Sequence, residues 1–101
     1  MHGDRTRIHL ITGTSGSYSY SPSSISAATI AVQTMTVTGL RLKDPYILTL
    51  PSTGTGDNSL LLIHTYISAA DTLKLLFYNV DVGAHTPPTP TASDPYVIKI
   101  G

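Results

Sequence analysis

The chain has 101 residues, enough for one domain but too few for two independent hydrophobic cores. Six basic and six acidic residues cancel, so we expect neither a nucleic-acid backbone nor an anionic membrane surface as a partner. The lack of cysteine excludes disulfides and thiolate metal sites, and the longest aliphatic run, Leu60 to Ile63, is too short to span a membrane.

The composition favours strands over helices. Serine, threonine, valine, isoleucine and tyrosine are abundant, glutamate is absent, and glycines and prolines fall between the apolar runs. Such a mixture is typical of short strands separated by turns. We therefore predict an all-β domain, an antiparallel β-sandwich of about six to seven short strands.

The N-terminal part is predicted to hold one strand and a long polar segment. In the first candidate strand, at residues 7–12, Ile8 and Leu10 alternate with the residues between them. The next segment, "GTSGSYSYSPSSISAA" at residues 13–28, is small and polar, which is typical of an extended arm or long loop and allows a short strand at residues 18–21.

This pattern sets the expected domain organisation, with an N-terminal strand and extended arm over residues 1–29 and a β-sandwich over residues 30–101. A strand on such a tether can pair with the sheet edge of a neighbouring chain as readily as with its own. We therefore expect the arm to reach a neighbouring subunit or another protein.

Further candidate strands follow at residues 30–38, 46–50, 60–67, 72–79 and 96–100. Most of them alternate large apolar side chains with other residues, as half-buried strands do. Residues 60–67 are mostly apolar, which fits a strand covered on both faces or a helix of two turns. The apolar sides of these strands predict a core that includes Val37, Leu48, Leu75, Phe77 and Ile98.

The order of four motifs, "TMTVTGL", "DPYILTLP", "ISAADTLKLLFYNVDVGAHTPP" and "YVIKI", extends over about residues 25–100. In this order the chain resembles small structural proteins of tailed bacteriophage particles, of the capsid decoration or cement type. The resemblance implies a virion protein on the capsid surface, made in the host cytoplasm, with a β-sandwich core and no catalytic residues. It implies the major capsid protein as partner, and a homotrimer, because decoration proteins often occupy threefold positions.

A second hypothesis is a carbohydrate- or host-surface-binding module of a tail fibre or appendage. The six tyrosines could form a platform on which sugars stack, since phage surface domains and carbohydrate modules share the sandwich. Tryptophan is absent and carboxylates are few, so the decoration protein is the favoured hypothesis.

Catalysis and metal binding are expected to be absent. Ser15 is not in a G-x-S-x-G elbow, because Gly16 follows it directly. The four histidines show no short ligand spacing, and the acidic side chains do not converge in one loop as calcium requires. The residues weighed for these roles are Ser15, His2, His9, His64, His85, Asp57 and Asp81. We predict no enzyme, no cofactor and no metal.

The segment "HTPPTP" contains a P-x-x-P pattern from Pro87 to Pro90 that an SH3-type groove could bind. We favour a stiffened connection between the last two strands, because proline lowers the entropy of a long loop that must hold one shape. A rigid, chemically inert loop suits contact with another protein surface. The predicted interface residues are Ile8, Leu10, Tyr18, Tyr20, Pro87, Pro88 and Pro90.

Overall fold

The structure is a computed structural model that describes residues 7–52 and 59–101. These residues contain seven strands and no helix, which confirms the predicted all-β class. In chain order the strands are β1 (Arg7–Ile11), β2 (Tyr18–Tyr20), β3 (Ile30–Val37), β4 (Tyr46–Thr49), β5 (Leu60–Ala69), β6 (Thr72–Asn79) and β7 (Tyr96–Ile100).

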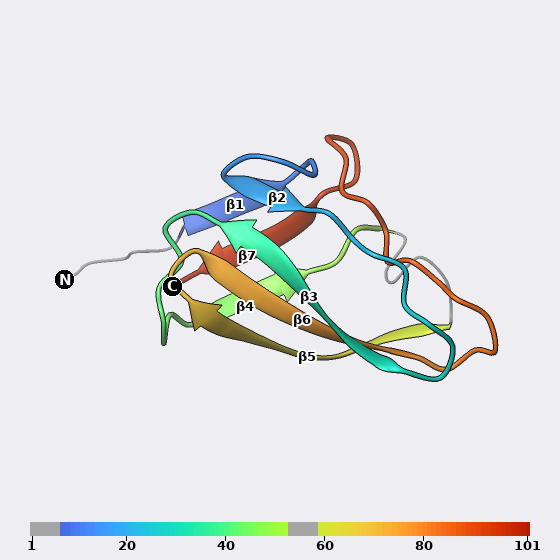
Figure 1. Ribbon diagram of the computed structural model, residues 1–101. Coiled ribbons are helices and arrows are strands. Elements are labelled where there is room, and N and C mark those ends of the chain that lie inside the picture. The colour runs from blue at the N-terminus through green and yellow to red at the C-terminus, as the bar shows by residue number, and fades with distance from the viewer. Residues whose placement is uncertain (1–6, 53–58) are drawn as a thin grey trace.

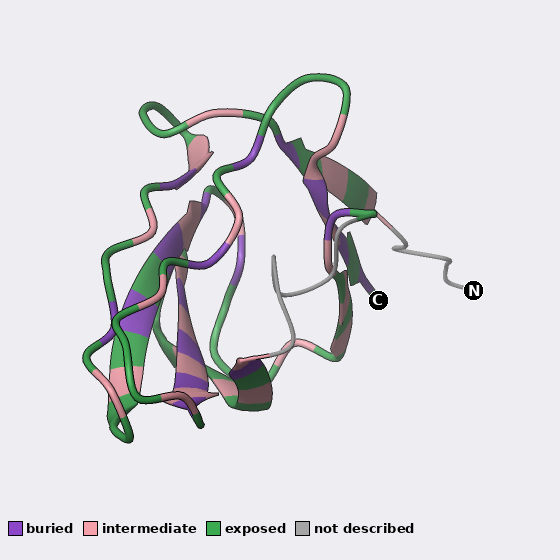
Figure 2. Cartoon of the chain, turned by 90° about the vertical axis from the view of Figure 1, so that its right-hand side faces the viewer, coloured by how far each residue is buried: buried purple, intermediate pink, exposed green. Residues whose placement is uncertain are grey.

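The strands form two antiparallel sheets that pack as a sandwich (Figures 1 and 2). Sheet A has three strands in the order β1-β7-β4, and sheet B has four in the order β2-β3-β6-β5. Figure 2 views the molecule along the space between the two layers. The predicted antiparallel β-sandwich is confirmed.

Alternation of side chains along the strands builds the core. In β6, Leu73, Leu75 and Phe77 point inward and are fully buried, while the residues between them are half-buried on the other face. The predicted core residues Val37 and Ile98 are also fully buried, but Leu48, in the edge strand β4, is only partly buried. The buried hydrophobic residues are Ile11, Tyr20, Ile25, Met35, Val37, Leu40, Leu60, Leu73, Leu75, Phe77, Tyr96, Ile98 and Ile100.

The apolar segment at residues 60–67 is a strand and not a helix, and it is longer than predicted, as β5 runs to Ala69. It pairs with β6 alone, and an irregularity between Leu62 and His64 shifts the register. Leu61 and Ile63 are exposed. The expectation that both faces of this strand are covered is therefore wrong, because sheet B has one face on the core and nothing in the described chain on the other.

The segment predicted as an arm lies against the same chain from residue 7 onward. The β1 strand pairs with β7 in sheet A, and β2 pairs with β3 in sheet B. Ile11, Tyr20 and Ile25 from this segment are buried in the core. Within the single chain, the few large side chains of residues 7–29 thus complete the core of their own sandwich, and the arm that reaches a neighbour stays a prediction.

The hairpin between β5 and β6 turns at Asp71, whose φ of 65° lies in the left-handed region that aspartate tolerates better than most residues. The Asp71 side chain accepts a hydrogen bond from the Gly39 amide at 2.8 Å, and the Asp71 amide donates to the Leu40 carbonyl at 2.8 Å. This turn thus ties the β5–β6 hairpin to the loop that leaves sheet B after β3.

Candidate interaction surfaces

The outward face of sheet A carries apolar side chains. Ile8 and Leu10, both predicted as interface residues, are exposed on β1. The strand register places Ile8, Lys99 and Ile47 in one row across the sheet. The next row holds Leu10, Val97 and Thr49. We call this surface face A, defined by Ile8, Leu10, Ile47, Thr49, Val97 and Lys99.

Lys99 is the one charged residue of face A, and it lies in the central strand between Ile8 and Ile47. It is exposed, and it makes no ion pair within the part of the chain that the structure describes. A partner that covers this face therefore has to place a carboxylate or other acceptor opposite the ammonium group, because a covered charge without a partner is costly.

The outward face of sheet B carries a larger apolar area that the sequence analysis did not identify. On β3, Ile30 and Val32 are more than half exposed. The register places Ile30 beside Tyr78, and Val32 beside Leu76. We call this surface face B, and its apolar half is defined by Ile30, Val32, Leu61, Ile63, Leu76, Tyr78 and Val80. The sequence signal for this exposed face was the alternation of "IAV" at the start of β3. It places Ile30 and Val32 on the side of the strand opposite the buried Met35.

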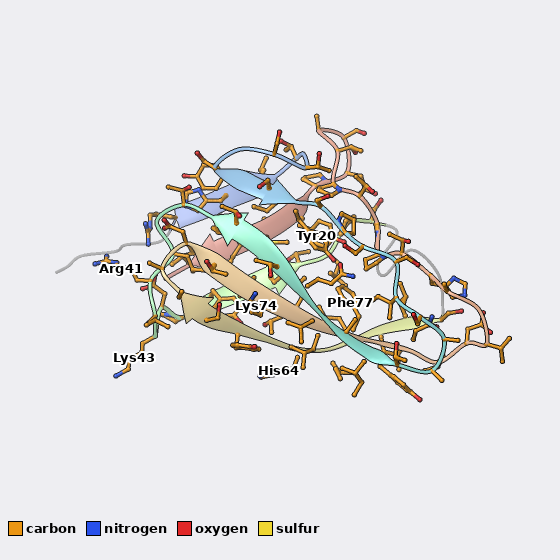
Figure 3. All side chains as sticks on the ribbon, viewed as in Figure 1. Tyr20, Arg41, Lys43, His64, Lys74 and Phe77 are labelled. Carbon is orange, nitrogen blue, oxygen red and sulfur yellow. The ribbon has the colours of Figure 1, made fainter. Side chains whose placement is uncertain are left out.

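The other half of face B is polar. Lys74 donates a hydrogen bond from Nζ to Thr34 Oγ1 at 2.6 Å across the β6–β3 pair. His64 stacks on Tyr66, with ring centroids 5.8 Å apart, at the outer strand β5. Figure 3 labels Lys74 and His64 on sheet B. Face B therefore changes along its strands from an apolar end to a polar end.

The predicted interface tyrosines have structural roles. Tyr18 is half-buried and stacks on His9, with ring centroids 4.6 Å apart. Tyr20 is fully buried, and its hydroxyl donates to Gln33 Oε1 inside the core. Burial raises the pKa of Tyr20 well above its usual range. Tyr20 is consequently inaccessible to a partner of the folded chain.

The proline segment is held against the domain. Pro87 and Pro90 are buried, and Pro88 is half-buried. The Tyr96 hydroxyl donates to the Pro88 carbonyl at 2.8 Å, while its ring packs edge-on against Tyr20. The P-x-x-P pattern therefore turns its two terminal prolines inward, away from any SH3-type groove, and the segment acts as a stiff connection.

A buried asparagine anchors the start of the same connection. Asn79 is fully buried, and its Nδ2 donates to the carbonyls of Ile25 and Gly83 at 3.0 and 2.8 Å. Its Oδ1 accepts from the Asp81 amide at 2.9 Å. Ile25 also forms a two-way backbone bridge with His85. The loop after β6 is thus fixed to the segment before β3.

Asp81 is the centre of a small polar cluster in this loop. His85 Nε2 lies 2.7 Å from Asp81 Oδ2, and Ser59 Oγ donates to the same oxygen at 3.4 Å. The hydrogen bond from His85 and that from the Val82 amide lower the pKa of Asp81. In a hydrolase triad the histidine lies between the serine and the carboxylate. Here the carboxylate lies between the serine and the histidine. The cluster therefore holds the loop in place and does not have the geometry of a catalytic triad.

The other residues weighed for catalysis or metal binding are dispersed. Ser15 is exposed in the turn before β2, and His64 lies on face B. His9 Nε2 is buried without a hydrogen-bond partner beside Tyr18. Across residues 7–52 and 59–101, no three histidine or acidic side chains converge as metal ligands. His2 and Asp57 lie outside the described residues.

Comparisons with known proteins add no assignment, because no family model, curated protein or solved structure matches the chain significantly. Within the described ranges there is no helix long and apolar enough to cross a membrane.

Proposed function

We propose that the protein is a virion structural protein, a capsid decoration or cement protein that binds the outer surface of a major capsid protein lattice and stabilises the head. The observation that supports this proposal best is the presence of exposed aliphatic side chains on the outward faces of both sheets. In an isolated sandwich the outward positions are mostly polar, and contiguous apolar patches mark interaction sites.

The two faces point away from each other because they belong to opposite layers of the sandwich (Figure 2). A small rigid domain with an apolar surface on each side can be held between two protein surfaces at once. This is the geometry that a cement protein needs, since it stabilises an assembly by binding its native form. The capsid as the assembly rests on the resemblance of the sequence motifs.

Face A is the surface that we assign to the capsid lattice. Ile8, Leu10 and Ile47 supply apolar contact area around the single cation, Lys99. Such a surface is complementary to a carboxylate surrounded by apolar side chains, and charge complementarity of this kind fixes the orientation of a docked protein. The trimer expected from the resemblance stays a prediction.

The alternative function, a sugar- or host-binding module of an appendage, has less support. Of the six tyrosines, only Tyr66 is exposed, and its ring stacks on His64. Tyr20 and Tyr96 are core residues. The tyrosines therefore do not form the exposed row of rings on which a glycan would stack.

Quantitative mass spectrometry of purified phage particles tests the proposed function. We expect the protein in a copy number similar to that of the major capsid protein, and particles without it should release their DNA at a lower temperature. A copy number of only a few per particle would favour the appendage, and absence from particles would refute both functions.

Addition of purified variants to particles that lack the protein tests face A. We expect Ile8→Lys and Ile47→Lys to weaken attachment, because each places a second cation beside Lys99 in a contact that has to exclude water. Ser15→Ala, His64→Ala and Asp81→Ala should leave attachment intact. Reproducible turnover of an ester, glycoside or peptide that one of these alanine changes removed would refute the non-catalytic proposal.

A further inference from the structure

We propose that residues 7–25 form an exchangeable segment, which completes the sandwich of its own chain in a monomer and the sandwich of a second copy in a strand-exchanged dimer. The turn at residues 26–29 is the hinge that opens between the two forms. Two features carry this inference, the contacts of the segment and the backbone of the hinge, and neither involves the capsid function.

The exchangeable segment supplies parts that the remaining chain lacks. It contributes one edge strand to each sheet, β1 to sheet A and β2 to sheet B. It also brings Ile11, Tyr20 and Ile25 into the core, where all three are buried. Without the segment, residues 30–101 would expose the edges of β7 and β3 and part of the core. A second copy of the chain carries the segment that fills these positions.

Outside its strands, the segment is held through its backbone by two buried amide side chains. Gln33 on β3 donates from Nε2 to the Ser23 carbonyl at 2.7 Å, and its Oε1 accepts from the Ser23 amide at 3.3 Å. Asn79 on β6 donates to the Ile25 carbonyl at 3.0 Å. Ile25 and His85 exchange backbone hydrogen bonds in both directions. The segment of a second copy is chemically identical, so it can make every one of these hydrogen bonds.

The hinge is a tight reversal that contains a strained residue. It connects β2 to its antiparallel neighbour β3 at the end of the sandwich where β3 begins (Figure 1). Thr29 Oγ1 donates to the Ser26 carbonyl at 2.8 Å across the turn. Ala28 is exposed and has a φ of 54°, in the left-handed region that is unfavourable for alanine. An extended hinge, as in the exchanged dimer, frees Ala28 from this conformation, and strain in a short hinge favours exchange.

The hairpin turn between β5 and β6 provides a contrast. Asp71 in that turn also has a left-handed φ, of 65°, but its side chain accepts a hydrogen bond from the Gly39 amide. Ala28 has only a methyl group, and its amide donates to the Asp81 carbonyl at 3.2 Å. No side-chain hydrogen bond offsets the strain at Ala28, so the turn at residues 26–29 is the one of these two that exchange relieves.

Introduced cysteines on β2 and β3 test the exchange, because the chain has no cysteine of its own. Ser19 and Thr36 are partners in the register of the two strands, at a spacing that allows a disulfide. Full-length chains with Ser19→Cys and with Thr36→Cys are unfolded, mixed, refolded at about 1 mM and oxidised after dilution to about 10 μM. Within an exchanged dimer the effective concentration is in the mM range, so we expect unlike chains to crosslink on the order of 100-fold faster than like chains.

Two changes at the hinge should shift the equilibrium in opposite directions. Ala28→Pro fixes φ near about −65°, which the closed turn does not allow, so the exchanged dimer, at twice the mass of 10.7 kDa, should become the main form. Ala28→Gly removes the strain of the closed form, because glycine adopts a positive φ freely, and should raise the dissociation constant on the order of 10-fold. Sedimentation velocity measures both, and circular dichroism establishes that each variant keeps its strands.

Three results would overturn the inference: like and unlike chains that crosslink at the same rate, an Ala28→Pro chain that folds as a monomer, or an Ala28→Gly chain that dimerises more strongly than the wild type. Crosslinking uses chains with the native hinge, so it decides the question even if Ala28→Pro does not fold. None of these measurements involves phage particles, whereas the capsid function is tested by the copy number in particles.

Discussion

Asn79 shows how one buried polar side chain fixes a long loop. Its Nδ2 donates to carbonyls of residues 25, 26 and 83, and its Oδ1 accepts from the Asp81 amide, so it joins two segments that are far apart in sequence. Asn79→Ala should lower the free energy of unfolding by at least about 1–3 kcal/mol, the cost of leaving a buried polar group unsatisfied. Urea denaturation measures the loss, and hydrogen exchange at the Ile25 and His85 amides should accelerate. A neutral substitution would show that the Asn79 hydrogen bonds do not secure this loop.

Neighbouring residues of β6 provide a direct test of the register. Leu75 and Phe77 are fully buried, whereas Leu76 between them is half-buried on face B. Phe77→Ala should cost about 3–5 kcal/mol and Leu75→Ala about 2–5 kcal/mol, because each leaves a cavity in the core. The matched change Leu76→Ala should cost clearly less in monomeric protein. Equal losses for Leu75→Ala and Leu76→Ala in urea denaturation would contradict the assignment of faces.

Asp81 is expected to make the stability depend on pH in the acid range. Its pKa is lowered in the folded chain, first by the hydrogen bond from His85, so the unfolded chain takes up a proton at a pH where the folded chain does not. The stabilisation is therefore present above the usual aspartate pKa of about 3.9 and is lost as the pH falls through the lower folded value. Urea midpoints from pH 6 to pH 2 should fall less steeply for Asp81→Asn. An identical slope would contradict this role.

Strands β1 and β2 determine whether residues 30–101 can fold as a domain without the N-terminal segment. Each of them completes one sheet, and they bring Ile11 and Tyr20 into the core. A chain that begins at Ile30 should therefore lose the cooperative unfolding transition and the dispersed amide spectrum of a folded protein. The 30–101 fragment should regain them when a peptide of residues 1–29 is added. A fragment that folds alone would support the arm predicted from the sequence.

The edge strands of the two sheets differ in how well they are protected against backbone pairing with strands of other chains. The edges β1, β2 and β4 are 5, 3 and 4 residues long, and short edges offer little backbone for pairing. The β5 edge is 10 residues long and carries no lysine, arginine, aspartate or glutamate. The irregularity between Leu62 and His64 interrupts its hydrogen-bonding edge. Short length protects three of the four edges against pairing with another chain, and the register shift protects the fourth.

Considered over the whole molecule, the two outward faces should differ in their importance for attachment to particles. If face A binds the lattice, Ile47→Lys should attach poorly, whereas the matched change Ile30→Lys, at an equally exposed isoleucine on face B, should attach like the wild type. Dissociation from particles after dilution measures both. If Ile30→Lys abolishes attachment and Ile47→Lys has no effect, face B is the surface that binds the lattice.

The pattern of residues was sufficient to predict the class of fold and most of the strand positions. Alternation in residues 72–79 and 96–100 predicted which side chains of β6 and β7 are buried, because a strand has a period of two and each sheet has one covered face. The pattern failed for the apolar residues 60–67, since periodicity alone does not show whether a second layer covers them.

The pairing of the N-terminal segment and the exposure of each surface became clear only from the three-dimensional arrangement of the strands. The pairing of β1 with β7 joins residues about 90 positions apart, and no local pattern encodes such a contact. The exposure of Ile30, Val32 and Leu61 on one surface depends on the order of strands in sheet B, which brings β3, β6 and β5 side by side. A patch is a property of neighbours in space, so the candidate sites on faces A and B became visible only when the strands were placed.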